Sequence, residues 1–149
     1  MEITGTVYDI LHNKGGQIWT TCLNDSVYDA IHLMGEKNIG ALVVVENEEV
    51  IGVLSERDYS RKVVLQGRTS RDTLVGEIVS RPAITVRSRD GIETCMQLMT
   101  GRRIRHLPVV DDGRLIGLVS IGDLVSWAMQ SQRHTIQQLQ GYICGDYPG

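Results

Sequence analysis

Residues 104–123 read IRHLPVVDDGRLIGLVSIGD, and residues 39–58 read IGALVVVENEEVIGVLSERD, a closely similar pattern 65 positions earlier. The similarity extends toward the N-terminus without a gap. Between positions 23 and 59 the two copies share eleven identical residues at this spacing. A gapless match of this extent indicates an internal duplication, so the chain is expected to hold two copies of one supersecondary unit.

Both copies predict the same order of elements: strand, helix, strand, strand, helix. A short strand is expected near 18–23 and again near 83–87, and Asp25 and Asp90 then lie where helix N-caps are expected. The helices that follow have the i, i+3, i+4, i+7 spacing of one buried face, formed by Val27, Ala30, Ile31 and Met34, and by Ile92, Cys95, Met96 and Met99.

A hairpin and a second helix complete each unit. The hairpin strands are expected at 41–45 and 50–54, and at 106–110 and 114–119, with polar turns between them. These runs are nearly continuous in Val, Leu and Ile, which predicts strands covered on both faces. The second helices are expected near 56–66 and 121–131.

The predicted fold class is α+β, with two βαββα units related by a pseudo-twofold axis and a short mixed sheet in each. The repeats span 17–66 and 83–131, and 67–82 forms a linker. An N-terminal helical segment, 1–16, and a C-terminal helix and tail, 132–149, lie outside the repeat. One unit alone is small for a stable core, so the two should pack together and form a cleft at their interface.

The composition is that of an ordinary globular protein, with 42% hydrophobic residues, 22% charged residues and a net charge of −3. The sequence has no apolar stretch long enough to cross a membrane and no signal-peptide pattern, so a cytoplasmic location is expected. The mild acidity argues against a general nucleic-acid binder. Cys22, Cys95 and Cys144 form no C-x-x-C pair and are interpreted as small buried thiols.

The repeated element Gly-h-h-Ser-x-x-Asp, where h is apolar, runs from Gly52 to Asp58 and from Gly117 to Asp123. It lies where a strand passes into a helix. Serine followed three residues later by an acid is a helix-capping pattern. Free N–H groups at a helix start also attract phosphate, a carboxylate there can accept from a ribose diol, and a strand glycine leaves room for a flat ring. Both interpretations stay open on the residues alone.

The two copies, in register and in this order of elements, resemble a tandem pair of cystathionine β-synthase (CBS) domains, a Bateman module, of the small stand-alone bacterial type. The resemblance covers roughly 17–131. It implies a non-enzymatic regulatory module for signal transduction that senses an adenosyl nucleotide, AMP, ADP, ATP or NAD(H), as a regulatory ligand and needs no catalytic cofactor. It also implies a homodimer and a separate regulated protein on which the module acts in trans.

The resemblance further implies which residues form two pockets facing the cleft. The motif aspartates would hold the ribose hydroxyls, the motif serines would lie near ribose or phosphate, and segments of the first and second strands would line the adenine slot. The residues expected to bind the ligand are Trp19, Thr20, Ile39, Gly40, Ala41, Ser55, Arg57, Asp58, Arg61, Ile84, Thr85, Ile104, Arg105, His106, Leu118, Ser120 and Asp123.

The charged positions differ between the copies. Arg57 and Arg61 correspond to Gly122 and Ser126, so the Asp58 pocket is expected to take the more highly charged phosphate group. Arg105 and His106, which correspond to Gly40 and Ala41, are further candidates to supply charge to one or both pockets. The alternative to ligand binding for Arg61 and Lys62 is a solvent-exposed helix face. For His106 it is a buried side chain whose hydrogen bonds are made within the protein.

Other functions have weaker support. The sequence has no G-x-G-x-x-G after a strand and no phosphate-binding G-x-x-x-x-G-K-[ST]. The four histidines form no spaced ligand set, so no metal site is expected, and nothing resembles the nucleophile elbow of a Ser-His-Asp hydrolase. Trp19 and Trp127 are packing residues or stacking platforms. The main alternative function is a protein- or RNA-interaction module with vestigial nucleotide pockets, for which the basic run Arg57, Arg61, Lys62 and Arg68 is the best support.

Overall fold

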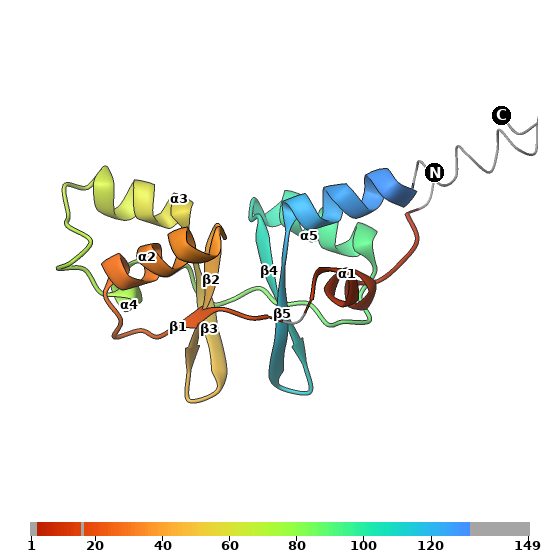
Figure 1. The fold of residues 1–149 in the computed structure, drawn as a ribbon, viewed down its shortest axis with the longest axis horizontal. Helices are drawn as coiled ribbons and strands as arrows, with labels where there is room; N and C mark the ends of the chain where they lie inside the picture. The colour runs from red at the N-terminus through yellow and green to blue at the C-terminus, as the bar shows by residue number, and fades with distance from the viewer. Residues whose placement is uncertain (1–2, 16, 132–149) are drawn as a thin grey trace, which may run out of the picture.

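The computed structural model describes residues 3–15 and 17–131, and in it two similar units lie side by side (Figure 1). The helices gather at one end of the molecule and the two β-hairpins extend toward the other. The predicted α+β class and the duplication are confirmed. The expected C-terminal helix, with Cys144 and His134, falls outside the described residues.

The first repeat contains β1 (Thr20–Thr21), α2 (Val27–Lys37), β2 (Ala41–Glu46), β3 (Glu49–Ser55), α3 (Glu56–Tyr59) and a π-helical turn η1 (Ser60–Val64). The second contains α5 (Ile92–Arg102), β4 (His106–Asp111), β5 (Arg114–Ser120) and a helix over 121–131. Two short helices, α1 (Val7–Lys14) and α4 (Val75–Ile78), precede and separate them. Within the described residues no helix is both long and apolar enough to cross a bilayer.

The two hairpins have the same register. Ala41 pairs with Ser55, and His106 pairs with Ser120. Each hairpin has a register shift at the corresponding place, between Val44 and Val45 and between Val109 and Val110. The internal duplication therefore holds at the level of individual backbone pairs and not only of element order.

The first strands are shorter than the sequence predicts. β1 has two residues and runs parallel to β2, which makes a mixed three-stranded sheet with β3. In the second repeat the expected strand near 83–87 is reduced to one parallel bridge between Val86 and Val109. Coverage on both faces holds for Ala41–Val44 of β2, which are fully buried, whereas burial alternates along β3 and β5.

The predicted N-caps are wrong by one residue. Ser26 caps α2 by accepting from the N–H of Asp29, and Gly91 is the N-cap of α5. Asp25 instead accepts from the N–H of Cys22 at 2.9 Å, and thereby closes the turn that leads into the helix. An aspartate at such a position can accept either from an N–H of the turn or from an N–H of the first helical turn. Here the Ser26 hydroxyl accepts from the helix, so the Asp25 carboxylate accepts from the turn.

Each repeat has its own apolar core. Val27, Met34, Leu42 and Leu54 belong to the core of the first repeat, and the second repeat has a matching core. The prediction of buried thiols is right for Cys95 and wrong for Cys22, which is exposed. Burial raises the pKa of the Cys95 thiol to about 11, so it stays protonated at neutral pH.

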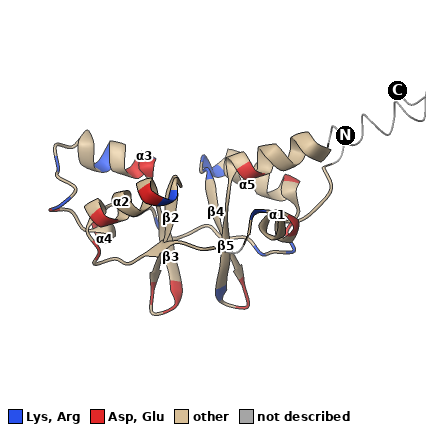
Figure 2. Ribbon diagram, viewed as in Figure 1, with Lys and Arg blue, Asp and Glu red and all other residues tan. Residues whose placement is uncertain are grey.

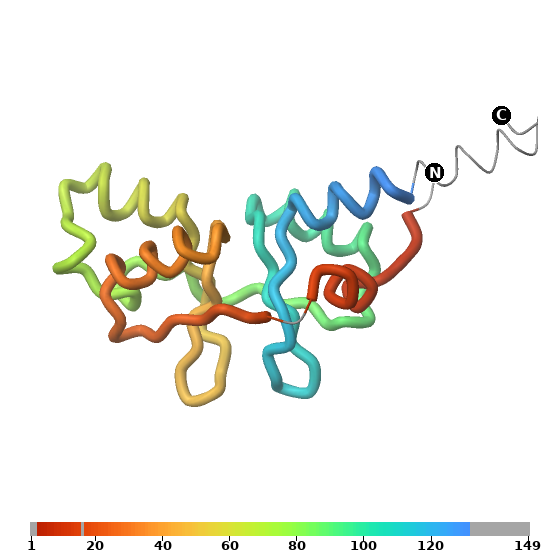
Figure 3. Tube along the Cα trace, in the orientation of Figure 1, coloured from red at the N-terminus to blue at the C-terminus, as the bar shows by residue number. Residues whose placement is uncertain are grey.

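The helices α1 and α4 are structural counterparts, a relation that the 65-residue spacing does not show because they are offset by 68 positions. Val75 N–H donates to the Asp25 carbonyl and Val7 N–H to the Asp90 carbonyl, each at 2.9 Å. At the start of both helices a carboxylate three residues on accepts from the N-cap N–H: Asp9 from Thr6 at 2.9 Å and Glu77 from Leu74 at 2.7 Å. Val75 and Ile78 of α4 enter the first core, and Val7 and Ile10 of α1 enter the second. Figure 3 shows α1 lying against the second repeat.

Candidate functional site

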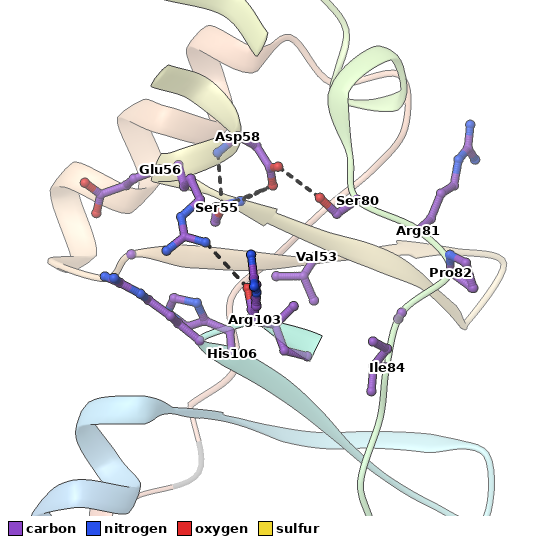
Figure 4. A pocket seen from close by; sticks show the side chains of 15 residues that line it. Val53, Ser55, Glu56, Asp58, Ser80, Arg81, Pro82, Ile84, Arg103 and His106 are labelled. Atoms are coloured by element: carbon purple, nitrogen blue, oxygen red, sulfur yellow. Dashed lines mark hydrogen bonds between the residues drawn. The ribbon is translucent and has the colours of Figure 1, made fainter. Parts of the chain in front are cut away.

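A cavity of about 490 Å³ lies between the repeats and is lined by both of them (Figure 4). Its walls are formed by the start of α3 with its preceding strand, by the chain that follows α4, and by the segment leading into β4. The lining residues are Gly40, Val53, Ser55, Glu56, Arg57, Asp58, Ser80, Arg81, Pro82, Ala83, Ile84, Arg103, Ile104, Arg105 and His106.

Asp58 is the most buried charged group of this cavity, with 8% of its surface exposed. Its Oδ2 accepts from the N–H of Ser55 at 3.0 Å and from the Ser55 hydroxyl at 3.1 Å. Its Oδ1 accepts from the Ser80 hydroxyl at 2.9 Å and lies 3.1 Å from Nζ of Lys62. The capping interpretation of the motif is therefore correct, and the same carboxylate also faces the cavity beside two serine hydroxyls.

The room beside Gly52 is taken by the protein itself. A Cβ at this position would lie 2.3 Å from the Ser80 carbonyl oxygen, because residues 79–81 run directly over the glycine and pair with Val53. The expectation that this glycine admits a flat ligand ring is wrong. Its physical role is the close approach of two backbones, which only glycine permits.

Positive charge gathers on the cavity wall. Four arginines and two acids line it, which leaves an excess of two positive charges. Arg57 of the first repeat donates to the backbone carbonyl of Arg103 in the second at 3.5 Å. Arg103 is the C-cap of α5 and has a φ of 55°, and basic residues precede β4 on the side facing the first repeat (Figure 2). This contact joins the two repeats at the cavity.

His106 stands at the start of β4, across the cavity from Asp58 and Ser80 in Figure 4. Burial lowers its pKa, Asp123 acts in the opposite direction, and Lys14 and Arg105 lower it further. The imidazole is therefore neutral at physiological pH. Its ring also lies under 4 Å from the place where a Cβ on Gly40 would stand, so it packs closely on the first repeat.

The family model for the CBS domain matches this chain twice, over residues 17–64 and 75–130. This chain belongs to the CBS-domain family. The resemblance drawn from the sequence is thereby confirmed, and the molecule is a CBS domain pair.

Related proteins share this architecture. A mitochondrial CBS domain-containing protein of Arabidopsis thaliana, CBSX3, is 43% identical over 151 residues, which cover 95% of this chain and 73% of the relative. A solved structure from Burkholderia ambifaria MC40-6, a CBS-domain protein for which a role in signal transduction has been suggested, is 50% identical with a TM-score of 0.82 and covers 86% of this chain and 96% of its own.

A further solved structure is the CBS domain pair of protein MJ0100 in complex with 5′-methylthioadenosine and S-adenosyl-L-methionine. It is 27% identical to this chain, with a TM-score of 0.73, and the match covers 84% of this chain and 95% of the other. That pair therefore binds adenosyl ligands.

The CBS cavity gathers about half of the residues expected from the sequence. Ser55, Asp58, Arg57 and Gly40 of the first repeat meet Ile84, Ile104, Arg105 and His106 of the second. The expected sharing of one pocket between opposite copies is thus present in the geometry.

The other expected residues lie elsewhere. Ala41 is buried at the start of β2, Arg61 is exposed on η1, and Thr20 lies exposed in β1. Trp19 packs against the first core, with Nζ of Lys37 4.4 Å from the ring centroid. Ile39 lines a groove between α2 and α3, and Thr85 lines a hollow beside the β4–β5 turn. Leu118, Ser120 and Asp123 belong to the motif of the second repeat.

Several lining residues were not predicted, above all Ser80, Arg81, Pro82 and Arg103. The first three lie in the linker, outside the two repeated segments from which the pocket residues are predicted. Arg103 directly precedes Ile104, and its place at the end of α5 was the available signal.

Among the described residues no group of three or more His, Cys, Asp or Glu is arranged to hold a metal ion.

The motif of the second repeat is built alike but has a different neighbour. Asp123 accepts from the N–H of Ser120 at 2.8 Å, as Asp58 does from Ser55. Its Oδ2 also lies 2.7 Å from Nζ of Lys14, which comes from the last turn of α1. Leu11 of α1 covers Gly117, where a Cβ would lie 2.6 Å from its side chain.

Proposed function

We propose that this CBS pair is a non-enzymatic regulatory module that binds an adenine nucleotide in the cavity beside Asp58. The observation that carries the proposal is the composition of that cavity. A carboxylate with two serine hydroxyls, an apolar wall and a group of arginines converge there from both repeats. These are the groups that a ribose, a purine and a phosphate respectively require.

The ribose would be held by Asp58. Two of the hydrogen bonds that its carboxylate accepts come from the hydroxyls of Ser55 and Ser80. A hydroxyl rotates easily toward another acceptor, so a ribose diol can take its place without leaving any group unpaired. The backbone N–H of Ser55 and the Lys62 ammonium would remain bound and keep the carboxylate oriented.

The adenine ring would lie against the apolar part of the wall. Val53, Ile84 and Ile104 line the cavity together with Pro82, and they come from both repeats. Ligand pockets are typically apolar surfaces with a few oriented polar groups, and this cavity has that character.

The arginines favour a phosphorylated ligand over other adenosyl compounds. The lining has an excess of two positive charges, and Arg57, Arg103 and Arg105 all approach from the side that joins the repeats. S-adenosylmethionine carries a positive sulfonium and 5′-methylthioadenosine carries no phosphate, so this lining suits neither as well. AMP, ADP, ATP and NAD(H) each bring the negative charge that the lining would neutralise.

Regulation would follow from the position of the ligand between the repeats. A nucleotide that contacts both repeats binds best to one relative orientation of the two, and its binding energy shifts the population toward that orientation. A partner protein that distinguishes the orientations would then respond to the nucleotide, and by linkage its binding would change the nucleotide affinity equally.

We also propose that two copies associate through the helical face. Val64 and Leu65 at the end of η1 are 54% and 74% exposed, and Val125 and Met129 on the helix over 121–131 are 43% and 49% exposed. Both helices lie at the same end of the molecule (Figure 1). An apolar surface of this kind on a small domain favours a protein contact.

A melting experiment tests the proposed ligand. The protein is heated with AMP, ADP, ATP, NAD, NADH or S-adenosylmethionine, and a phosphorylated adenosyl ligand at one hundred times its dissociation constant should add about 2.7 kcal/mol to the free energy of unfolding. Turnover of ATP and NADH is measured in parallel and should be absent. A melt that no adenosyl ligand shifts, together with salt-dependent RNA binding that AMP leaves unchanged, would instead favour the interaction-module alternative.

A further inference from the structure

The His106 side chain lines the cavity without a hydrogen bond of its own. Its backbone pairs with Ser120 at the start of the second hairpin, which fixes the position of the ring. Among the described residues neither ring nitrogen has a hydrogen-bond partner, and neither is fully buried. A neutral imidazole has one donor and one acceptor nitrogen, and a protonated one has two donors. Both nitrogens are therefore available to a ligand or to a proton from solvent.

The first repeat approaches this imidazole at Gly40. A Cβ on the glycine would lie 3.7 Å from Nε2 of His106 and 3.4 Å from Oε1 of Glu56, the first residue of α3. The glycine thus lets the ring of one repeat and a carboxylate of the other reach the same edge of the cavity. At the 65-residue spacing His106 corresponds to Ala41 and Glu56 to Ile121, so the equivalent positions of the opposite repeats carry no such pair of ionisable groups.

Positive charge predominates around the ring. The other charged groups that line the cavity are Arg57 and Asp58 of α3, Arg81 of the chain after α4, and Arg103 and Arg105 ahead of β4. The charges of Asp123 in the second motif and of Lys14 in α1 also act on the ring. Together with Glu56 these groups are five cations and three acids. In Figure 4 the Arg81 side chain points away from His106.

A nucleotide phosphate would reverse this balance. In the ligand-free protein burial lowers the pKa of His106, Asp123 acts in the opposite direction, and Lys14 and Arg105 lower it further. The phosphate of AMP brings about two negative charges at neutral pH. Bound among the arginines of the cavity, it would offset their charge and favour the protonated imidazole. The protonated ring is in turn a charged donor to the phosphate.

We propose that nucleotide binding in this cavity is coupled to the uptake of a proton by His106, so that the affinity for a phosphorylated ligand rises as the pH falls. The proposal rests on the proposed function and makes the pair sensitive to pH as well as to the nucleotide. The proton passes from solvent to the ring nitrogen that lacks one, and no other bond forms or breaks. Since proton and nucleotide binding are linked, each promotes the other equally.

Calorimetric titration with AMP in two buffers of different ionisation enthalpy measures the proton uptake at one pH. The wild type should take up a net fraction of a proton per AMP bound near pH 7, and adenosine, which has no phosphate, should cause none. The AMP phosphate would itself release protons among the arginines, so its own titration has the opposite sign.

The pH dependence of the affinity gives the matched comparison. As the pH is lowered from 7.5 to 6, the AMP affinity of the wild type should rise relative to that of His106→Gln, by up to about tenfold per pH unit. His32→Gln is the control and should behave as the wild type. His32 also titrates, but it is exposed on α2, lies 3.4 Å from the Glu36 carboxylate and does not line the cavity.

The outcomes separate the inference from the proposed function. Equal proton uptake by the wild type and His106→Gln, equal uptake with AMP and adenosine, or parallel pH profiles would overturn the inference and leave the nucleotide site in place. If His106→Gln does not fold, NMR titration of the imidazole C–H signals of the wild type decides, because the pKa of His106 must be higher with AMP than without it, and an unchanged value overturns the inference. Absence of AMP binding at every pH rejects both.

Discussion

Asp58 and Asp123 occupy equivalent positions in the two repeats, and each carboxylate accepts from the N–H of the serine three residues before it. Their surroundings differ. Asp58 faces a cavity and accepts from the Ser80 hydroxyl, whereas Oδ2 of Asp123 lies 2.7 Å from the ammonium of Lys14. The same motif thus caps a helix in both repeats but lines the cavity in only the first. Matched variants at Asp58 and Asp123 can therefore separate the capping role from ligand binding.

Replacing Asp58 by Asn should weaken AMP binding at least about tenfold, because one carboxylate oxygen that accepts hydroxyl hydrogen bonds becomes an amide donor. Asp123→Asn is the matched control. Both variants lose the same capping interaction and should lose about 1 kcal/mol of stability, but Asp123→Asn should leave the AMP affinity of the wild-type site within about twofold. Equal losses of affinity would mean that the motif acts only through folding. Titration calorimetry and thermal melts give the two quantities.

Replacing Arg105 by Gln should reduce ATP affinity about tenfold and leave adenosine affinity almost unchanged, because the lost guanidinium would pair with phosphate. The control is Arg71→Gln, since Arg71 stacks on the Tyr28 ring at 3.8 Å and does not line the cavity. Competition titrations with both ligands at two salt concentrations measure the effect. A similar loss for adenosine would place Arg105 against the nucleoside instead.

Gly52→Ala should destabilise the protein by about 1–3 kcal/mol, because the new Cβ meets the backbone oxygen of Ser80 and either β3 or the segment 79–81 must move. Gly117→Ala should cost less, since its nearest neighbour is the flexible end of Leu11. Gly101→Ala, in helix α5 with nothing within 4 Å, should stabilise by up to about 1 kcal/mol. Chemical denaturation measures the free energy of unfolding of the three variants. A different order of stabilities would contradict the close approach of the Ser80 backbone to Gly52.

His106 should make stability fall as the pH is lowered. Burial lowers its pKa in the folded protein. Below about pH 6.5 the imidazole is therefore protonated in the unfolded chain before it is protonated in the folded protein, which favours unfolding. The loss begins as the pH falls through the unfolded value and is complete below the folded one. His106→Gln should remove this part of the dependence, so the melting temperature of the wild type should fall more than that of the variant between pH 7.5 and pH 5. Parallel curves would contradict the buried neutral imidazole.

A charge placed on the exposed helical face should prevent self-association. Val125→Glu and Leu65→Glu should give a monomer at concentrations where the wild type is a dimer, because each would bury a carboxylate in an apolar contact. Arg114→Glu, on the exposed end of the β4–β5 hairpin, is a charge-changing control that should stay dimeric. Light scattering after size-exclusion chromatography measures the mass. A monomeric wild type rejects the proposed contact.

The sequence predicts the repeats well because they rest on local chemistry. The gapless spacing, the hairpin turns and the apolar helix faces all translate into the observed register and into two matching cores. The serine–aspartate motif forms the expected capping box because both partners lie within one turn.

The remaining features depend on contacts between distant segments. Ser80 reaches Asp58 across 22 positions and Lys14 reaches Asp123 across 109, and neither pair has a pattern in the sequence. The correspondence between α1 and α4 is hidden by its different offset. The prediction that Gly52 leaves room for a ligand ring is wrong for the same reason, because the segment that fills this room, residues 79–81, is distant in the sequence.

The central claim is that a nucleotide lies in the cavity shared by the repeats, and amide NMR during an AMP titration tests it most directly. The account predicts saturable shifts of the signals of Ser55–Asp58 in the first repeat and of Ile104–His106 in the second, with Ser120–Asp123 changing little. Shifts confined to one repeat, or to surfaces away from these residues, would contradict it.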